Sequence, residues 1–261
     1  MQIMKAYSKY IYGIVLPVLI LAVWQWIGVM QLLPPQMLPT PLAIAGTFVD
    51  LSINGILLDN LSISVYRAAI GFAIGGGLGL LTGMLVGFYR KTEYTLDPTL
   101  QMIRTVPHLA IMPLFILWFG FGEFSKVLLI AKGAFFPLYL NTFLGIRAVD
   151  SKLFEVSRVL EFSKFNQVTK VILPAAMPNI LLGVRLSLGM AWLSLIVAEL
   201  MGANAGVGYM ISDARQFAQT DVVFVGIVIF AVVGKLTDSL VRKLEDRLLR
   251  WRDNYNGSEI G

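Results

Sequence analysis

Charged and amide side chains interrupt the long apolar stretches of this sequence, and these residues are the first candidates for chemistry. A charge inside a bilayer costs roughly 2.5–3.5 kcal/mol on insertion scales, so such a residue is a functional candidate by default. The residue types present can offer hydrogen bonds and charge to a solute or to one another. The candidates are Arg104, His108, Lys132, Asn141, Arg185, Glu199 and Lys235.

The chain contains few residues suited to covalent catalysis or metal binding. The sequence contains no Cys and one His, which excludes a thiolate metal site and argues against a His-rich metal centre. The same shortage argues against an intramembrane enzyme, because such an enzyme needs a nucleophile with its base or a set of metal ligands. We therefore expect no catalytic residue and no metal ligand.

A phosphate-binding loop is also missing from the sequence. Such a loop needs the pattern GxxxxGK followed by Ser or Thr, whose backbone amides cradle phosphate. The nearest match is Gly234-Lys235, but Ile229 stands where the first Gly is required and Leu236 stands where Ser or Thr is required. The chain itself is therefore not expected to bind ATP.

The composition indicates a protein dissolved in lipid. The chain of 261 residues is 57% hydrophobic and 14% charged, whereas soluble domains average roughly a quarter charged residues. Lipid is the solvent that makes so little polar surface workable. We predict an all-α polytopic membrane protein with six transmembrane helices, forming a single domain over residues 1–261. The net charge of +5 is assigned to cytoplasmic loops, not to nucleic-acid binding.

Six apolar segments have about the 20 residues that a spanning helix needs. The first could pass for a signal peptide, but it contains Trp24 and Trp26 and no small-x-small cleavage site follows, which favours an uncleaved span. Pro107 and Pro113 predict a kink in the third. The predicted spans are residues 10–30, 62–88, 98–119, 124–146, 176–201 and 222–240.

Other patterns describe how these spans are connected and packed. Thr40 can cap, and Pro41 can begin, a helix over residues 41–50 that is too short to cross the membrane. Residues 202–221 are predicted to form a polar loop. A stripe of small residues on the second span predicts close helix packing, at Gly75, Gly79, Gly83 and Gly87.

Lysine and arginine are distributed asymmetrically about the six spans. The side of the membrane that holds both termini has most of the basic loop residues, and the opposite loops have only Lys126 and Arg215. Because basic loops stay in the cytoplasm, we expect both termini and residues 147–173 to be cytoplasmic. The basic residues on this side are Lys5, Lys9, Arg90, Lys91, Arg147, Lys152, Arg158, Lys164, Lys170, Arg242, Lys243, Arg247, Arg250 and Arg252.

The cytoplasmic segment before the fifth span shows two short helical patterns. The first covers residues 155–160, and Ser163 can cap a second over residues 164–171. Pro174 and Pro178 then mark the return to the membrane. Two short amphipathic helices on such a loop are shaped to dock on another protein, and a merely solvated loop is the alternative.

Glu155-Val156-Ser157, followed by Val171-Ile172-Leu173-Pro174, resembles the EAA motif of ABC importer permeases. That motif reads Glu-Ala-Ala, three residues, Gly, nine residues and Ile-x-Leu-Pro, and the spacing matches in full. Val156 and Ser157 replace the alanines, and Glu161 replaces Gly. Because Glu tolerates a left-handed turn poorly, we expect the turn between the two helices to shift toward Phe162-Ser163.

Further stretches resemble the branch of this family that imports nitrate, sulfonates, taurine and bicarbonate, and they are most similar to the aliphatic sulfonate importers. The resemblance extends from about residue 16 to residue 251. The stretches that resemble the branch are residues 38–41, 67–79, 101–108, 117–120 and 203–209. The runs most similar to the aliphatic sulfonate importers are residues 104–120, 192–208 and 219–221.

The resemblance implies the type I (MetI-like) ABC importer permease fold in the bacterial inner membrane, with two copies forming the pathway. The coupling loop, about residues 147–175, would dock on a cytoplasmic ATPase dimer that binds ATP and Mg²⁺, and an extracytoplasmic binding protein would deliver substrate. The chain itself would hold no cofactor. The implied coupling residues are Glu155, Val156, Ser157, Arg158, Glu161, Leu173 and Pro174.

The resemblance also places the third to fifth spans along the pathway, which makes Arg104, His108, Asn141 and Arg185 pathway candidates. A sulfonate is a monoanion with three acceptor oxygens, and donors with weak positive potential would suit its passage. The two arginines could instead snorkel to cytoplasmic helix ends, and His108 could satisfy backbone groups freed by Pro107.

Glu199, near the outer end of the fifth span, is also a pathway candidate that could gate the outer mouth. The favoured interpretation is a structural pair of Glu199 with Lys132 or Lys235. Residues expected to be exposed on the outer side could dock the binding protein or be merely solvated; they are Glu123, Lys126, Asp213, Arg215 and Asp221.

Several substrates and one other class of protein stay open. Taurine, nitrate, bicarbonate and vitamin-precursor importers share the implied architecture, and the separate binding protein holds much of the selectivity. An ATP-independent secondary transporter is the more distant alternative, because a self-contained carrier has no need of a docking motif at residues 147–173.

Overall fold

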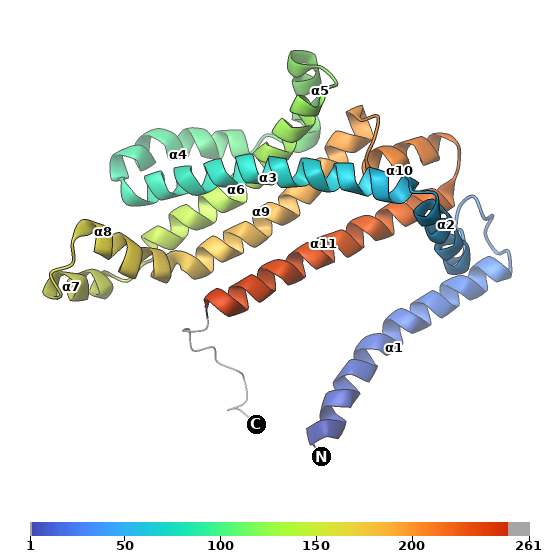
Figure 1. Ribbon diagram of the computed structural model, residues 1–261, viewed down its shortest axis with the longest axis horizontal. Coiled ribbons are helices and arrows are strands. Elements are labelled where there is room, and N and C mark those ends of the chain that lie inside the picture. Colours follow the sequence, from blue (N-terminus) through green and yellow to red (C-terminus); the bar gives the residue numbers. More distant parts are fainter. Residues whose placement is uncertain (1, 250–261) are drawn as a thin grey trace.

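A computed structural model describes residues 2–249 of the chain, with side chains from residue 15 onward, and every regular element in this range is a helix (Figure 1). Arg250 and Arg252, two of the basic residues expected on the cytoplasmic side, lie outside the described residues. The elements are α1 (Gln2–Val29), α2 (Pro41–Ile53), α3 (Ile56–Phe88), α4 (Arg90–Arg104), α5 (His108–Phe119), α6 (Glu123–Arg147), α7 (Ser151–Val159), α8 (Lys164–Gln167), the π-helical segment η1 (Val168–Ile172), α9 (Leu173–Gly202), α10 (Val207–Gln216) and α11 (Thr220–Leu248).

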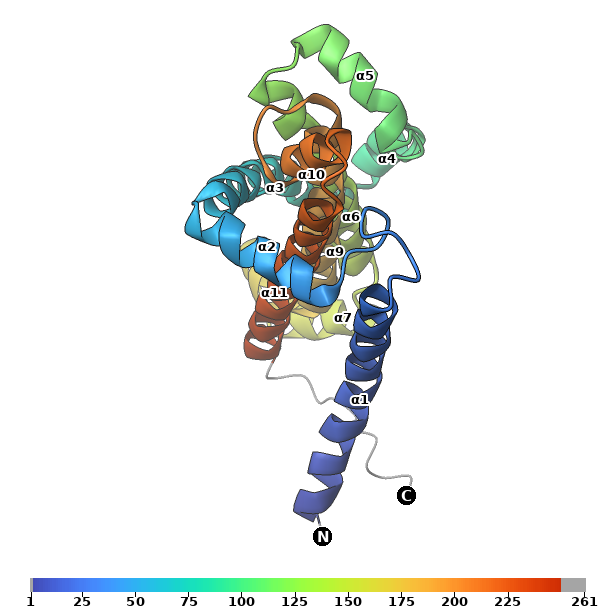
Figure 2. The same cartoon turned by 90° about the vertical axis from the view of Figure 1, so that its right-hand side faces the viewer.

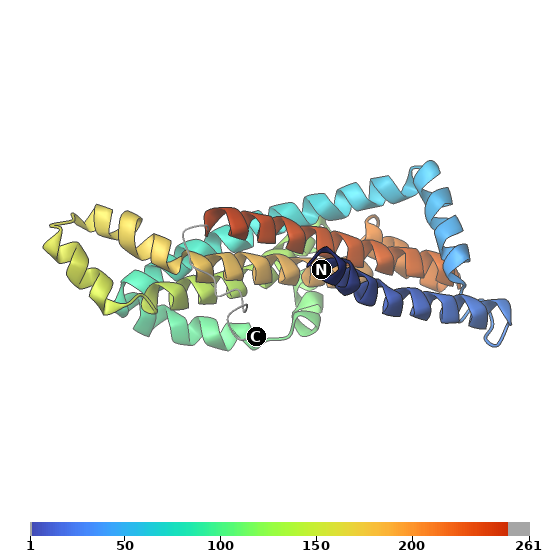
Figure 3. The same cartoon turned by 90° about the horizontal axis from the view of Figure 1, so that it is seen from below.

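Four long helices form the body of the molecule. Helices α3, α6, α9 and α11 are apolar and long enough to cross a membrane, and the pair α4–α5 makes a fifth candidate span. They run along the long axis of the molecule, which carries α7 and α8 at one end and α2 and α10 at the other (Figures 1 and 3). The described apolar part of α1, Val15–Val29, is shorter than a full span, so the sixth span stays a prediction.

The glycine stripe of α3 lies against α6, as the sequence predicts. A Cβ atom added to Gly75 would collide with the carbonyl oxygen of Ala131, and one added to Gly79 would collide with that of Phe135. Absence of the side chain therefore lets the two helix backbones meet. This seam makes α3 and α6 a rigid wall on which α9 packs through α6.

The third predicted span is broken, not simply kinked. Helices α4 and α5 meet at an angle of 98° across residues 105–107, because Pro107 has no N–H to continue the hydrogen-bonding ladder. Helix α4 also begins at Arg90 and not near Pro98. It is attached to α6 by the Tyr139 hydroxyl, which donates to Asp97 at 2.6 Å. Helix α5 turns out of the bundle (Figure 2).

The end of the molecule opposite α7 and α8 contains two short helices. Helix α2 begins at Pro41, and the Thr40 hydroxyl accepts from the Ala43 amide at 3.2 Å, which confirms the predicted cap. Helix α10 occupies residues 207–216, where the sequence analysis predicted only a polar loop. Figure 2 shows α1 extending downward and away from the bundle.

Candidate functional site

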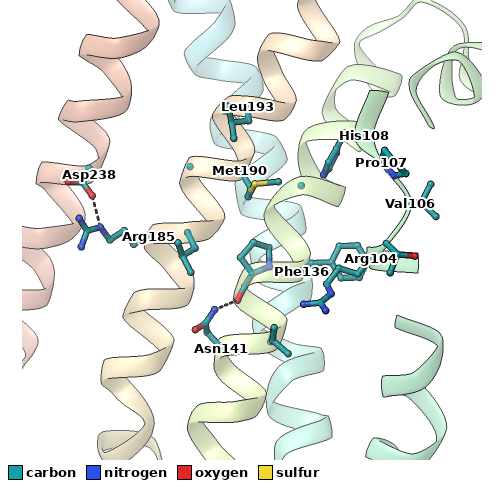
Figure 4. A pocket seen from close by; sticks show the side chains of 16 residues that line it. Arg104, Val106, Pro107, His108, Phe136, Asn141, Arg185, Met190, Leu193 and Asp238 are labelled. Carbon is teal, nitrogen blue, oxygen red and sulfur yellow. Dashed lines mark hydrogen bonds and ion pairs between the residues drawn. The ribbon is translucent and has the colours of Figure 1, made fainter. Parts of the chain in front are cut away.

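A cavity of about 710 Å³ opens beside the break between α4 and α5. Its walls come from the end of α4, the start of α5, α6, α9 and one residue of α11 (Figure 4). Four side chains predicted separately from the sequence line this one cavity: Arg104, His108, Asn141 and Arg185. The rest of the lining is largely apolar and includes Val106, Phe136, Leu140, Leu186, Met190 and Leu193.

The broken helix shapes one wall of the cavity. The Lys132 ammonium donates to the Val106 carbonyl at 2.7 Å, so a carbonyl at the break is satisfied by a side chain of α6. His108 is the first residue of α5, and its Nδ1 lies 3.5 Å from the Ser194 hydroxyl. Lys132 thus satisfies a backbone carbonyl at the helix break. His108 contacts a hydroxyl of α9 and not a freed backbone group.

The two arginines of the cavity are held differently. Arg185 Nε lies 2.5 Å from Asp238 Oδ1, an ion pair that joins α9 to α11. Arg104 forms no ion pair among the residues whose side chains are described. Asn141 donates to the Pro137 carbonyl at 2.8 Å. The cavity therefore presents one paired and one unpaired guanidinium.

Sequence reasoning missed Asp238, which also lines the cavity. A signal was present in the sequence, because Asp238 lies just before the predicted end of the sixth span and three residues after Lys235. That spacing places the two on one helix face, and their side chains lie 4.0 Å apart. The pattern could not reveal Arg185 as the closer partner, since that residue is on another helix.

Glu199 lies outside the cavity, in a buried cluster at the α10 end of the bundle. Its carboxylate is 2.8 Å from Arg67 Nη1 and accepts from the Ser64 hydroxyl and the Gly208 amide, both at 2.8 Å. The predicted pairing with Lys132 or Lys235 is wrong. Arg67 reaches Glu199 from α3, so this ion pair joins α3 to α9.

The same arginine holds the segment between α9 and α10. Arg67 donates to the Ala205 carbonyl at 2.6 Å and forms a two-pronged pair with Glu123, also at 2.6 Å. The Gly206 amide donates to Asn60, and the Val207 amide donates to Ser64. These bonds fix the start of α10 against α3. We call Ser64, Arg67, Glu123 and Glu199 the arginine cluster.

The residues predicted to be exposed on this side differ in their actual exposure. Glu123 and Arg215 are exposed, whereas Asp213 and Asp221 are half-buried, and Asp221 accepts a hydrogen bond from Thr47. Lys126 is only 3% exposed, which contradicts the prediction. Its ammonium turns back to the Phe121 carbonyl at 2.9 Å and to Glu123.

The coupling loop forms a compact projection at the opposite end of the molecule. The Asp150 carboxylate caps α7, and the Ser163 hydroxyl caps α8 as predicted. Glu155, Val156 and Arg158 are exposed on α7. Ser157 is buried, and Gln167 donates to its hydroxyl at 2.9 Å. The packing therefore requires a small side chain at position 157, where the motif has Ala.

The turn of the coupling loop stays at Glu161. This residue has φ of +50°, in the left-handed region where the motif has Gly. The expected shift toward Phe162-Ser163 is wrong, because Ser163 is already committed to capping α8. The departure from the motif is therefore accommodated as local backbone strain.

An apolar surface covers the tip of the coupling loop, and we call it the apolar tip. Its side chains are exposed although they are hydrophobic, as expected where another protein docks. Leu173 and Pro174 begin α9 directly after η1, so the tip is attached to the helix that carries Arg185. The members of the apolar tip, with exposed fractions, are Val156 (54%), Val159 (83%), Leu160 (57%) and Phe165 (75%).

The helical bundle with a projecting loop matches the fold of solved ABC transporter subunits. One is the MetNI methionine ABC transporter in inward-facing conformations, with a TM-score of 0.59 at 17% identity over 74% of this chain and 97% of that one. Another is an amino acid ABC transporter with histidines, with a TM-score of 0.60 at 21% identity over 78% of this chain and 97% of that one. The chain thus has the ABC importer permease fold.

The family follows from the sequence comparison. Residues 75–250 match the family of binding-protein-dependent transport system inner membrane components, and the chain belongs to that family. It is a multi-pass permease subunit and not an enzyme, and membership implies a separate ATPase and a substrate-binding protein as partners.

Three similar proteins have names that state a transported substrate. A Bacillus subtilis (strain 168) protein whose name assigns it to aliphatic sulfonates transport, SsuC, is 65% identical over 94% of this chain and 89% of its own length. The Escherichia coli (strain K12) protein of the same name is 48% identical over 94% and 93%. The taurine transport system permease protein TauC of Escherichia coli (strain K12) is 35% identical over 89% and 86%.

Proposed function

We propose that the chain forms the membrane pathway of an ATP-driven importer for aliphatic sulfonates. Two copies enclose the pathway, both termini face the cytoplasm, and a binding protein outside the membrane delivers the substrate. ATP and Mg²⁺ are bound by a partner ATPase dimer. The observation that carries the proposal is the single cavity in which Arg104 and Arg185 meet an otherwise largely apolar lining.

The chemistry of the cavity suits a sulfonate bearing an alkyl chain. Guanidinium groups donate to oxyanions in a planar fork, and an apolar lining accepts the hydrocarbon part. Arg104 is unpaired among the described side chains, so it is the group that is free to meet an anion. The two relatives named for aliphatic sulfonates, at 65% and 48% identity, support the same substrate class.

Taurine is the second candidate substrate. It carries the same sulfonate group together with an ammonium, and the relative named for its transport is 35% identical. The lower identity of that relative favours aliphatic sulfonates over taurine.

Reconstitution tests the substrate class. The permease, its ATPase and its binding protein are placed in proteoliposomes, and ATP-dependent uptake of radiolabelled ethanesulfonate, taurine and nitrate is measured. We expect ethanesulfonate to enter fastest, and Arg104→Ala and Arg185→Ala to lower uptake while the ATPase remains bound. Uptake of nitrate without uptake of any sulfonate would overturn the proposal.

The coupling loop supplies the proposed connection to the ATPase. The apolar tip enters a groove on the ATPase, and closure of the ATPase pair moves α9 and rocks the two copies between inward-open and outward-open forms. Replacement of Val159 (83% exposed) by Asp should release the ATPase during purification. Full uptake and full ATPase retention in that variant would contradict this role.

A further inference from the structure

One acidic side chain lies in the proposed pathway. Asp238 of α11 lines the cavity, and its carboxylate is 2.5 Å from Arg185. Figure 4 shows the Arg185 side chain turned toward Asp238, with Arg104 on the other side of the cavity. We propose that Asp238 is a specificity-determining residue that matches the cavity to monoanions. This inference rests on the proposed function and deepens it.

The charges that line the cavity are few. They come from Arg104, Arg185 and Asp238, together with His108 if it is protonated. Asp238 compensates Arg185, which leaves the positive charge of Arg104 without an acidic partner. Most other lining residues are apolar, so few polar groups screen these charges. With a neutral histidine, Asp238 therefore lowers the net positive charge of each copy's cavity lining by one, which weakens the attraction of a dianion more than that of a monoanion.

Two further cations lie close to Asp238 on the same helix. Arg242 and Lys235 are 3.6 Å and 4.0 Å from its carboxylate, and their side chains are 58% and 73% exposed. Neither residue lines the cavity. They cannot replace Asp238, because they have the same sign as Arg185. Without Asp238, the Arg185 guanidinium would be free for the transported anion and repelled by both neighbours.

The physical consequence depends on the charge of the solute. A dianion feels any added positive potential twice as strongly as a monoanion does. Asparagine at position 238 would therefore favour dianions relative to monoanions, by a factor on the order of ten for charges separated by several ångströms. It would also slow release of the monoanion, since the Asp238 carboxylate would no longer compete with that anion for the Arg185 guanidinium.

Equilibrium displacement measures this preference. Radiolabelled ethanesulfonate is bound to the permease–ATPase complex in nanodiscs and displaced by unlabelled ethanesulfonate or by ethane-1,2-disulfonate, a dianion with the same head group. We expect Asp238→Asn to shift the displacement ratio toward the dianion about tenfold and Asp238→Glu to leave it unchanged. The double variant Arg185→Gln/Asp238→Asn keeps the wild-type charge sum and should return the ratio near the wild-type value.

The other outcomes refute either the charge-matching role of Asp238 or the proposed function. An unchanged ratio in an assembled Asp238→Asn complex, or an equal shift in Asp238→Glu, refutes the charge-matching role. If Asp238→Asn does not assemble, Arg185→Gln is compared with the double variant, and an equal ratio in these two refutes it. Absence of ethanesulfonate binding and uptake by the wild-type complex refutes the proposed function, and this inference with it.

Discussion

Arg67 of the arginine cluster and Arg104 of the cavity are held in opposite ways. Arg67 is 3% exposed and has two carboxylates and a carbonyl within 2.8 Å, so every side of its guanidinium is occupied. Arg104 is exposed and forms no ion pair among the described side chains. A buried charge with a full set of partners holds helices together, whereas an open one is available to a solute. The comparison separates structural charges from transport charges in one bundle.

The largest expected effect is the loss of Arg67. Arg67→Ala would leave Glu199, whose side chain is fully buried, without its counter-ion. An unpaired buried charge costs about 3–5 kcal/mol, so the unfolding midpoint of the purified protein in detergent should fall steeply. Arg104→Ala is the matched control and should change stability by less than about 1 kcal/mol. Equal midpoints for the two variants would erase the distinction between the two sites.

The next effect concerns the closely packed seam that positions the arginine cluster. Gly75→Ala places a methyl group against the Ala131 carbonyl, whereas a methyl group at Gly77 meets nothing within 4 Å. Overpacking of this kind costs about 1–3 kcal/mol. Detergent unfolding should therefore separate Gly75→Ala from Gly77→Ala. If both behaved like the wild type, the α3–α6 contact would be looser than the structure has it.

Arg104 is expected to affect transport and not stability, in contrast to Arg67. Arg104→Ala should lower sulfonate uptake about tenfold, equivalent to about 1.4 kcal/mol, with an unchanged unfolding midpoint. Arg104→Lys keeps the charge and should retain part of the uptake, since a lysine offers a point charge without the planar fork. Uptake at the wild-type rate in Arg104→Ala would remove this residue from the pathway.

The sequence could predict the features that depend on local patterns. Apolar segment length revealed α3, α6, α9 and α11, and Thr40, Pro41 and Ser163 revealed helix starts. Motif spacing predicts the coupling loop at about residues 147–175, and its coupling role and docking residues stay a prediction. These properties are readable because each depends on residues that are neighbours in the chain.

The predictions that failed concern contacts between helices that are far apart in the sequence. The partner of Glu199 lies 132 positions away at Arg67, and that of Arg185 lies 53 positions away at Asp238. No spacing rule connects residues on different helices, so charge type alone suggested the wrong partner for Glu199. The prediction that Lys126 is exposed failed for a similar reason. Polar residues occur both in exposed loops and at helix starts, so the local sequence could not show that the Lys126 side chain turns back into the protein.

The smallest expected effect tests the strained turn of the coupling loop. Glu161 has φ of +50°, and a left-handed conformation costs a residue other than Gly about 1–2 kcal/mol. Glu161→Gly removes this cost but gains chain entropy in the unfolded state, so a net stabilisation of about 0.5–1 kcal/mol is expected. Hydrogen exchange of backbone amides between residues 157 and 163 should slow by about threefold.

Glu161→Ala distinguishes the two possible causes of such a change. Alanine removes the charge of Glu161 but keeps the Cβ atom that is unfavourable at positive φ. Exchange in Glu161→Ala should therefore be as fast as in the wild type or faster, while only Glu161→Gly shows protection. Equal protection in both variants would assign the effect to the carboxylate, and the turn would then be unstrained despite its position in the motif.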